Sequence, residues 1–239
     1  FGQINGFATE AIAPGSHVNF TLEFTAPATA PSFETATYRV TSTDPDTPTV
    51  DVVLAGSSGV PRINTTMENG GVFGNVCVGQ SKTLNLVIQS VGDCPVSVNT
   101  IAFAGGSGQF SLAPDQTLPA VLSPGDSLNV AVTLAPTVLG AQSDTIVIGS
   151  TDAANPTVNV PISGETLPPG LSYVLENGGA FGATCRFHIK SLDLVLNNTG
   201  QCPLHVSNIV QTAGPVAFAP SSVVSFPLVV APGASLEVP

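Results

Sequence analysis

Short runs in which apolar and polar residues alternate recur along the chain. A turn at residues 124–125 is followed by Leu128, Val130, Val132 and Leu134, which places four apolar side chains on one face of an extended segment. Such a period of two predicts a half-buried β-strand. By this criterion we expect strands in the middle of the chain at residues 62–67, 71–78, 82–90, 95–103, 109–113, 118–122, 127–135, 143–150 and 157–163.

Turn-forming residues separate these runs at short intervals. The chain holds 24 Gly and 21 Pro, and turn signals fall between most of the expected strands. No segment of ten or more residues has the 3.6-residue period of an amphipathic helix. Many short strands joined by tight turns predict an all-β fold built from immunoglobulin-like antiparallel β-sandwiches.

The pattern repeats along the chain. Glu68-Asn69-Gly70-Gly71 recurs as Glu176-Asn177-Gly178-Gly179, and 176 − 68 gives an offset of 108 residues. A unit of about this size is ordinary for one sandwich. We therefore expect three tandem units. The N-terminal unit (1–60) would be the second half of a repeat, the central unit (61–165) a complete one, and the C-terminal unit (166–239) the front part of a third.

Composition narrows the classes of partner. Hydrophobic residues make up 43% of the chain and charged residues only 9%, well below the roughly 25% of ordinary soluble domains. The net charge is −11, and five Lys and Arg residues cannot form a basic patch. Nucleic acid and anionic membrane surfaces are therefore excluded as partners. No apolar run approaches the ~20 residues that span a bilayer, so we expect no membrane insertion in this segment.

Several ordered motifs resemble a known family. They look like those of the ASH (abnormal-spindle and hydin type) immunoglobulin-like domain, especially its secreted bacterial versions in "choice-of-anchor" surface proteins. The resemblance covers essentially the whole chain, and it implies non-enzymatic tandem scaffolds without catalytic residues. The motifs that carry it are Phe73-Gly74-Asn75-Val76, Ser90-Val91-Gly92-Asp93-Cys94-Pro95, Ser123-Pro124-Gly125, Ser150-Thr151-Asp152 with Asn155-Pro156, Ser42-Thr43-Asp44-Pro45-Asp46-Thr47-Pro48, and Gly164.

Four cysteines form two pairs of identical spacing. Cys77 and Cys94 are 17 residues apart, and so are Cys185 and Cys202. We expect a hairpin-like run to bring each pair together, which predicts disulfides Cys77–Cys94 and Cys185–Cys202. The alternative is four buried thiols. Disulfides imply an oxidising compartment, so we expect an extracellular or cell-surface location, or the periplasm.

A zinc site is a second interpretation of the cysteines in the C-terminal unit. Cys185 with His188, and Cys202 with His205, form a C-x2-H…C-x2-H array of zinc-like ligand types. The middle unit argues against it, because Gln80 stands at the first histidine position. A strand also points residues i and i+3 to opposite faces. We therefore predict no metal ligand.

Two further motifs have a chemical and a structural interpretation. The acidic turn around Asp44 and Asp46 has oxygens that could bind Ca²⁺, but the matching turn keeps only Asp152, so we favour a turn-capping Asp. Lys82 and Lys190 occupy equivalent repeat positions. They could form isopeptide bonds, or they could be solvated charges that protect a sheet edge.

No residues are arranged for catalysis. There is no G-x-S-x-G motif, no Gly-rich phosphate loop before a helix, and the three histidines lie in unrelated contexts. The sequence thus predicts neither an enzyme nor a cofactor. Sequons for N-glycosylation occur at Asn19, Asn64 and Asn197.

These features predict a structural role. Tandem disulfide-linked sandwiches would form a stalk, sheath or filament at the cell surface, with copies of itself or neighbouring repeats as partners. Because the first unit lacks its front and the last lacks its back, chains could assemble head to tail by strand donation. The alternative to assembly is a longer repeat protein. The alternative function is an adhesin or ligand-binding accessory module.

Overall fold

The computed structural model describes residues 11–28, 31–106, 108–114, 117–215, 217–218 and 225–238. The chain divides into two compact parts, Phe1–Val60 and Pro61–Pro239. Their described elements are nearly all β-strands, apart from two short 3-10 turns. This confirms the predicted all-β class of antiparallel sheets.

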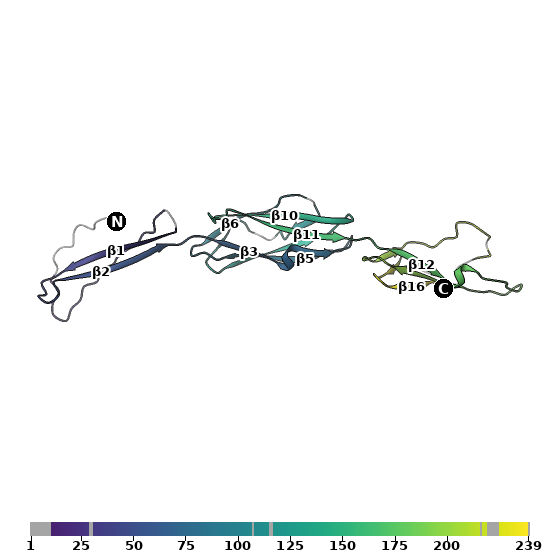
Figure 1. Ribbon diagram of the computed structural model, residues 1–239, viewed down its shortest axis with the longest axis horizontal. Coiled ribbons are helices and arrows are strands. Elements are labelled where there is room, and N and C mark those ends of the chain that lie inside the picture. The colour runs from purple at the N-terminus through teal and green to yellow at the C-terminus, as the bar shows by residue number, and fades with distance from the viewer. Residues whose placement is uncertain are drawn as a thin grey trace. The chain divides into compact units, whose positions relative to one another are not determined.

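The N-terminal unit is built on one hairpin (Figure 1). Strand β1 (Ser32–Thr41) pairs antiparallel with β2 (Thr49–Ser58), from Ser32 opposite Ser58 to Thr41 opposite Thr49. The run Val18, Phe20, Leu22 and Phe24 alternates as Leu128 to Leu134 does and is therefore also a candidate strand, but it does not form one. In the central unit the equivalent strand β9 (Ser127–Leu134) pairs with β5 (Lys82–Ser90), and the strand is defined by that pairing.

The central unit is a sandwich of two sheets. Figure 1 shows β10, β11 and β6 in one layer and β3 and β5 in the other. The first sheet has the order β4-β11-β10-β6-β8, and the second has the order β3-β5-β9-β7. The strand bounds are β3 (Ile63–Met67), β4 (Val72–Asn75), β5 (Lys82–Ser90), β6 (Val96–Phe103), β7 (Phe110–Leu112), β8 (Ala120–Leu122), β9 (Ser127–Leu134), β10 (Gly140–Ser150) and β11 (Thr157–Thr166).

Alternation along these strands fills one core between the sheets. Strand β5 contributes Leu84, Leu86 and Ile88, and β10 contributes Ile146 and Ile148, all at most 2% exposed. The remaining buried residues of the cluster are Phe73, Val76, Val96, Val98, Phe110, Leu122, Val130, Val132, Leu134, Val160 and Ile162. Burial of this apolar area is the main contribution to stability.

The expected central strands are found with small shifts. All nine are present, and the main differences lie at their ends: β10 starts earlier, at Gly140, and β11 continues to Thr166. The expected strand 71–78 is shortened to β4. It is preceded by the 3-10 turn η1 (Glu68–Gly71), in which Asn69 and Gly70 have positive φ angles of 49° and 61°. Asn and Gly tolerate this left-handed region, so the Asn-Gly pair forms a turn that separates β3 from β4.

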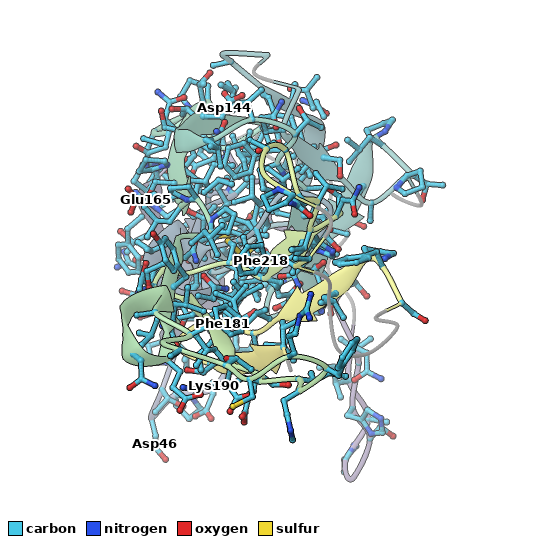
Figure 2. The ribbon with its side chains drawn as sticks, turned by 90° about the vertical axis from the view of Figure 1, so that its right-hand side faces the viewer. Asp46, Asp144, Glu165, Phe181, Lys190 and Phe218 are labelled. Atoms are coloured by element: carbon cyan, nitrogen blue, oxygen red, sulfur yellow. A yellow bond between two sulfur atoms is a disulfide. The ribbon has the colours of Figure 1, made fainter. Side chains whose placement is uncertain are left out.

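The C-terminal unit repeats the front of the central one. Its pairings, β12 with β13 and β13 with β16, match β3 with β5 and β5 with β9 at an offset of 108 residues. Phe181 and Phe218 lie with ring centroids 5.5 Å apart, as do Phe73 and Phe110 (Figure 2). The elements are β12 (Leu171–Leu175), η2 (Glu176–Gly179), β13 (Leu194–Asn198), β14 (Leu204–Val206), β15 (Leu228–Val230) and β16 (Ser235–Val238).

Truncating a core side chain should destabilise the central sandwich strongly. We predict that Leu86→Ala lowers the free energy of unfolding by about 2–5 kcal/mol, because Leu86 is fully buried and its removal leaves a cavity. Val121→Ala is the control, since Val121 lies on β8 and is 69% exposed. Urea unfolding followed by circular dichroism measures both, and equal midpoints for the two variants would contradict the core assignment.

Candidate functional site

A disulfide joins the central unit to the C-terminal unit. It links Cys77 to Cys202, with the Cα atoms 5.6 Å apart, while Cys94 and Cys185 are free cysteines. Both predicted pairs, Cys77–Cys94 and Cys185–Cys202, are therefore wrong. The bond crosses from one repeat to the next.

Strand length explains why the predicted pairing fails. Cys77 lies just before β5 and Cys94 just after it, and β5 runs without interruption from Lys82 to Ser90. A nine-residue strand spans roughly 30 Å at about 3.3 Å per residue. A disulfide requires Cα atoms within about 7 Å. The two cysteines thus lie at opposite ends of the same strand.

The topology brings Cys77 to the linker between the units. Strand β4 pairs parallel with β11, and the amide of Val76 donates to the carbonyl of Glu165 at 2.9 Å. Both segments therefore run to the same end of the sandwich, where β11 leads into the linker, residues 167–170. Cys77 follows Val76 directly and is 8% exposed.

Cys202 reaches the same linker from the other unit. Leu171, at the start of β12, lies opposite Asn198, at the end of β13. The loop that follows β13, residues 199–203, therefore lies beside the linker. The amide of Thr199 donates to the carbonyl of Gly170 at 2.8 Å, and that of Gln201 donates to Pro168 at 3.3 Å. Cys202 is 5% exposed.

The side chain of Asn198 holds this loop from inside. It is 1% exposed, and its Oδ1 accepts from the amides of Gly170 at 3.1 Å and Gly200 at 3.0 Å. Its Nδ2 donates to the carbonyls of Cys202 at 2.8 Å and Val230 at 2.9 Å. One amide group thus connects the linker, the cysteine loop and β15. It satisfies four backbone groups that would otherwise be buried without partners.

Asn75 makes the corresponding contacts from the central unit. Its Oδ1 accepts from the amide of Leu167 at 3.0 Å, and its Nδ2 donates to the carbonyl of Gln201 at 3.4 Å. Asn75 therefore bridges the first linker residue and the loop of the next unit. The disulfide lies directly beside it, so covalent and polar contacts fix the same junction.

Sequence reasoning missed both asparagines. Asn198 corresponds to Ser90 and Asn75 to Ala183, so neither is repeated in the chain. The disulfide did leave a signal, because 202 − 77 is 125, the sum of one repeat and the spacing of 17. The two spacings fit pairing within a repeat and pairing between repeats equally well.

The histidine and cysteine array is not assembled as a site. Cys202 is held in the disulfide, whereas Cys185, His188 and His205 are exposed. Within the part of the chain that is described, no group of three or more His, Cys, Asp or Glu side chains is placed to hold a metal ion. The same part contains no helix that is long and apolar enough to cross a bilayer.

Both acidic turns are capped by their own aspartates. Asp44 Oδ1 accepts from the amides of Asp46 at 2.9 Å and Thr47 at 3.3 Å, and the Thr47 hydroxyl donates to Oδ2. These bonds, that from Asp46 above all, lower the pKa of Asp44. Asp152 Oδ1 accepts from the amides of Ala154 and Asn155 in the same manner, and its Oδ2 also accepts from the amide of Ile63 in β3. The turn-capping interpretation is confirmed.

The repeated lysines each bind a backbone carbonyl. Lys82 Nζ donates to the carbonyl of Phe73 at 2.6 Å, and Lys190 Nζ donates to that of Phe181 at 2.6 Å (Figure 2). In each unit the lysine therefore ties its own segment to the phenylalanine nine residues before it. The contact is structural and is common to both units.

The asparagines of the three sequons differ in exposure. Asn19 and Asn64 are exposed, whereas Asn197 is half-buried and its Oδ1 accepts from the hydroxyl of Ser235 at 2.7 Å. Whether any of them carries a glycan stays a prediction.

The central unit matches the model of one protein family. Residues 71–165 match the family described as "HYDIN/CFA65/VesB-like, Ig-like domain". No curated protein matches the chain.

Several solved structures are similar to parts of the chain at low identity. The ASH/PapD-like domain 7 of human CEP192 is 13% identical, with 45% of this chain and 86% of that domain covered and a TM-score of 0.35. A Porphyromonas gingivalis W83 protein of unknown function is 17% identical, with 58% and 68% covered and a TM-score of 0.35. The CsuC–CsuE chaperone–adhesin complex of Acinetobacter baumannii is 13% identical, with 73% and 86% covered and a TM-score of 0.30.

Removing the Asn198 amide should loosen the junction. We predict that Asn198→Ala costs about 1–3 kcal/mol, because buried backbone groups lose their partners. Hydrogen exchange at the amides of Gly170 and Gly200 should become faster. Asn197→Ala is the control, since Asn197 is the neighbouring residue of the same strand and its side chain accepts from the hydroxyl of the exposed Ser235. Unchanged protection at Gly170 and Gly200 in Asn198→Ala would show that the amide does not hold the loop.

Acid should weaken the turn capped by Asp44. Because the folded-state pKa of Asp44 lies below its ordinary value of 3.8, the stabilisation is present above that pH and is lost as the pH falls through the lowered pKa. Carboxyl chemical shifts should therefore titrate with a midpoint below 3.8. In Asp44→Asn the amide shift of Thr47 should lose this pH dependence. A midpoint at or above the ordinary value would be the contrary result.

Proposed function

We propose that the chain is a non-enzymatic structural module of an extracellular or cell-surface protein. The match of residues 71–165 to the HYDIN/CFA65/VesB-like family of immunoglobulin-like domains supports this proposal. In this role it is a stiff segment of a stalk, sheath or filament. The observation that carries the proposal is the Cys77–Cys202 bond, which ties one unit to the next across their linker.

The junction is built to limit motion between units. Neighbouring immunoglobulin-like domains joined by a linker normally move relative to one another, unless a large interface holds them. Here the linker has a disulfide beside it, and Asn75 and Asn198 bind its backbone at Leu167 and Gly170. Such a junction transmits force and orientation from one unit to the next. A spacer requires this property, whereas an isolated binding domain does not.

The disulfide also supports the proposed location. Disulfides persist in oxidising compartments and are rare where thiols are kept reduced. A bond that closes a separation of 125 residues stabilises the folded state by restricting the unfolded chain. The family is typically non-catalytic, which agrees with a mechanical role.

The test compares the junction with and without its disulfide. Both proteins carry Cys94→Ser and Cys185→Ser, and one also carries Cys77→Ser and Cys202→Ser. We predict that losing the bond costs about 2–5 kcal/mol. ¹⁵N relaxation should report one shared rotational correlation time for the central and C-terminal units with the bond, and two different times without it.

The central sandwich should stay folded in both proteins, since its core does not depend on the bond. Independent tumbling of the two units while Cys77–Cys202 is intact would contradict the spacer function.

A further inference from the structure

We propose that a loop of the C-terminal unit, residues 185–190, docks into a hollow on the central unit of a second copy of this chain. These residues are named the Phe187 loop. The inference deepens the proposed structural function by giving it a partner, and it rests on that function. The contact joins neighbouring modules through a loop of one and a sheet face of the other.

The same turn occurs in both units, but only one copy has glycine at its strained position. In the central unit the amide of Gln80 donates to the carbonyl of Cys77 at 2.9 Å, and Gly79 between them has a φ of 81°. In the C-terminal unit residues 185–188 close in the same way at 3.1 Å, and Phe187 has a φ of 69°. Glycine tolerates this angle, whereas a residue with a Cβ is strained there.

This strain points to a function of the Phe187 side chain. Among the described residues other than glycine, only Asn69, Asn177 and Phe187 have a positive φ. Asn is the residue that tolerates the angle best after glycine, and Phe has no such tolerance. A strained backbone that persists where glycine would fit is typical of a binding position.

The Phe187 ring does not contribute to a core. It is 99% exposed, and Ile189 is 94% exposed. Their repeat positions in the central unit, Gly79 and Ser81, are exposed as well. Within the described part of the chain, a Cβ placed on Gly79 would meet no atom within 4 Å, although the Cys77–Cys202 bond joins the next unit there. The turn itself therefore directs this side chain into solvent.

Basic residues alternate with the two apolar ones. Arg186, His188 and Lys190 are all exposed. The first 165 residues hold 13 of the 16 acidic residues and three of the five Lys and Arg residues, a net charge of −10. The loop thus concentrates the other two basic residues around an apolar tip. Such a loop complements an acidic surface with an apolar hollow, and the acidic part of another copy is such a surface.

The central unit has a hollow of this kind. It has a volume of about 430 Å³ and lies beside η1, against β10 and β11. Gly70 and Pro161 contribute to its wall, together with Asp144 and Ser163. Pro161 and Ser163 are exposed on the outer face of β11, and the exposed Glu165 is the next residue of that face. An aromatic ring against Pro161 would therefore have carboxylates beside it for the flanking basic residues.

Loop and hollow are different surfaces, so the contact is heterologous. Every copy has both, and the contact can continue from one copy to the next. A single loop buries less area than a stable interface, so two copies in solution associate weakly. Modules held close together on one surface raise the effective concentration, and the same contact then becomes strong. This property suits a sheath or a bundle of stalks.

The first test measures association in solution. All proteins carry Cys94→Ser and Cys185→Ser, so that thiols cannot link copies. Sedimentation equilibrium of the full chain should show concentration-dependent association. Phe187→Gly should weaken it about tenfold or more, because the ring no longer leaves water. Tyr173→Ser is the control, since Tyr173 is 70% exposed on β12, outside the loop, and its loss should change nothing.

The same glycine variant separates binding from a role in folding. Because glycine relieves the strained φ angle, Phe187→Gly should raise the urea midpoint of the C-terminal unit while it weakens association. A ring that only supported the fold would have the opposite effect on the midpoint.

A second pair of variants tests the hollow. Ser163→Arg places a bulky cation in it and should weaken association as much as Phe187→Gly does. Asn159→Arg is the matched control, because Asn159 is exposed on the same face of β11 and adds the same charge four residues away. It should leave association unchanged. With p-benzoylphenylalanine in place of Phe187 and one copy labelled with ¹⁵N, light should crosslink the loop to residues 161–163 of the other copy.

Three results would overturn the proposal: a monomer at every concentration, association that survives Phe187→Gly, or crosslinks outside the central unit. A monomer that sediments with phosphatidylcholine vesicles through Phe187 would assign the loop to a lipid surface instead. None of these results would give the central and C-terminal units different rotational correlation times. Failure of this inference is thus distinct from failure of the spacer function.

Discussion

The contact on which the arrangement of the central and C-terminal units depends is the disulfide between two loops that flank a short linker. Cys77 is brought there by a parallel pairing of β4 with β11, and Cys202 by the turn that follows β13. Cys77 and Cys202 themselves lie outside the strands, in the loops that follow β4 and β13. Asn198 and Asn75 supply the polar contacts, and the covalent bond makes them persistent, because a backbone that cannot separate loses little entropy when it forms further bonds.

The strands of the central sandwich could be predicted because the patterns that define them lie within short stretches of sequence. Alternation along β5 and β9 fixes which side chains enter the core, and turn residues fix where strands end. The N-terminal unit shows the limit of this reasoning. Residues 18–24 alternate just as well, yet they form no strand. Alternation shows which face of a segment is apolar, but it does not show whether the segment joins a sheet.

The disulfide pairing failed for a different physical reason. Equal spacings in two repeats do not state whether a bond lies within or between them. The length of β5 decides the matter, and residues 82–90 were correctly expected to be a strand. A rigid element of roughly 30 Å between Cys77 and Cys94 excludes their pairing. The sequence therefore contained the correction, but only if strand length and cysteine spacing were considered together.

Repeat comparison separates two kinds of residue, and the junction uses both. Lys82 and Lys190 make the same bond in both units, so their recurrence marks a property of the fold. Asn75 and Asn198 do not recur. Asn75 binds across to the loop of the next unit, and Asn198 holds the linker and that same loop from inside its own unit. A junction in a repeat protein is best sought where the repeat is broken by a polar residue beside a repeated cysteine.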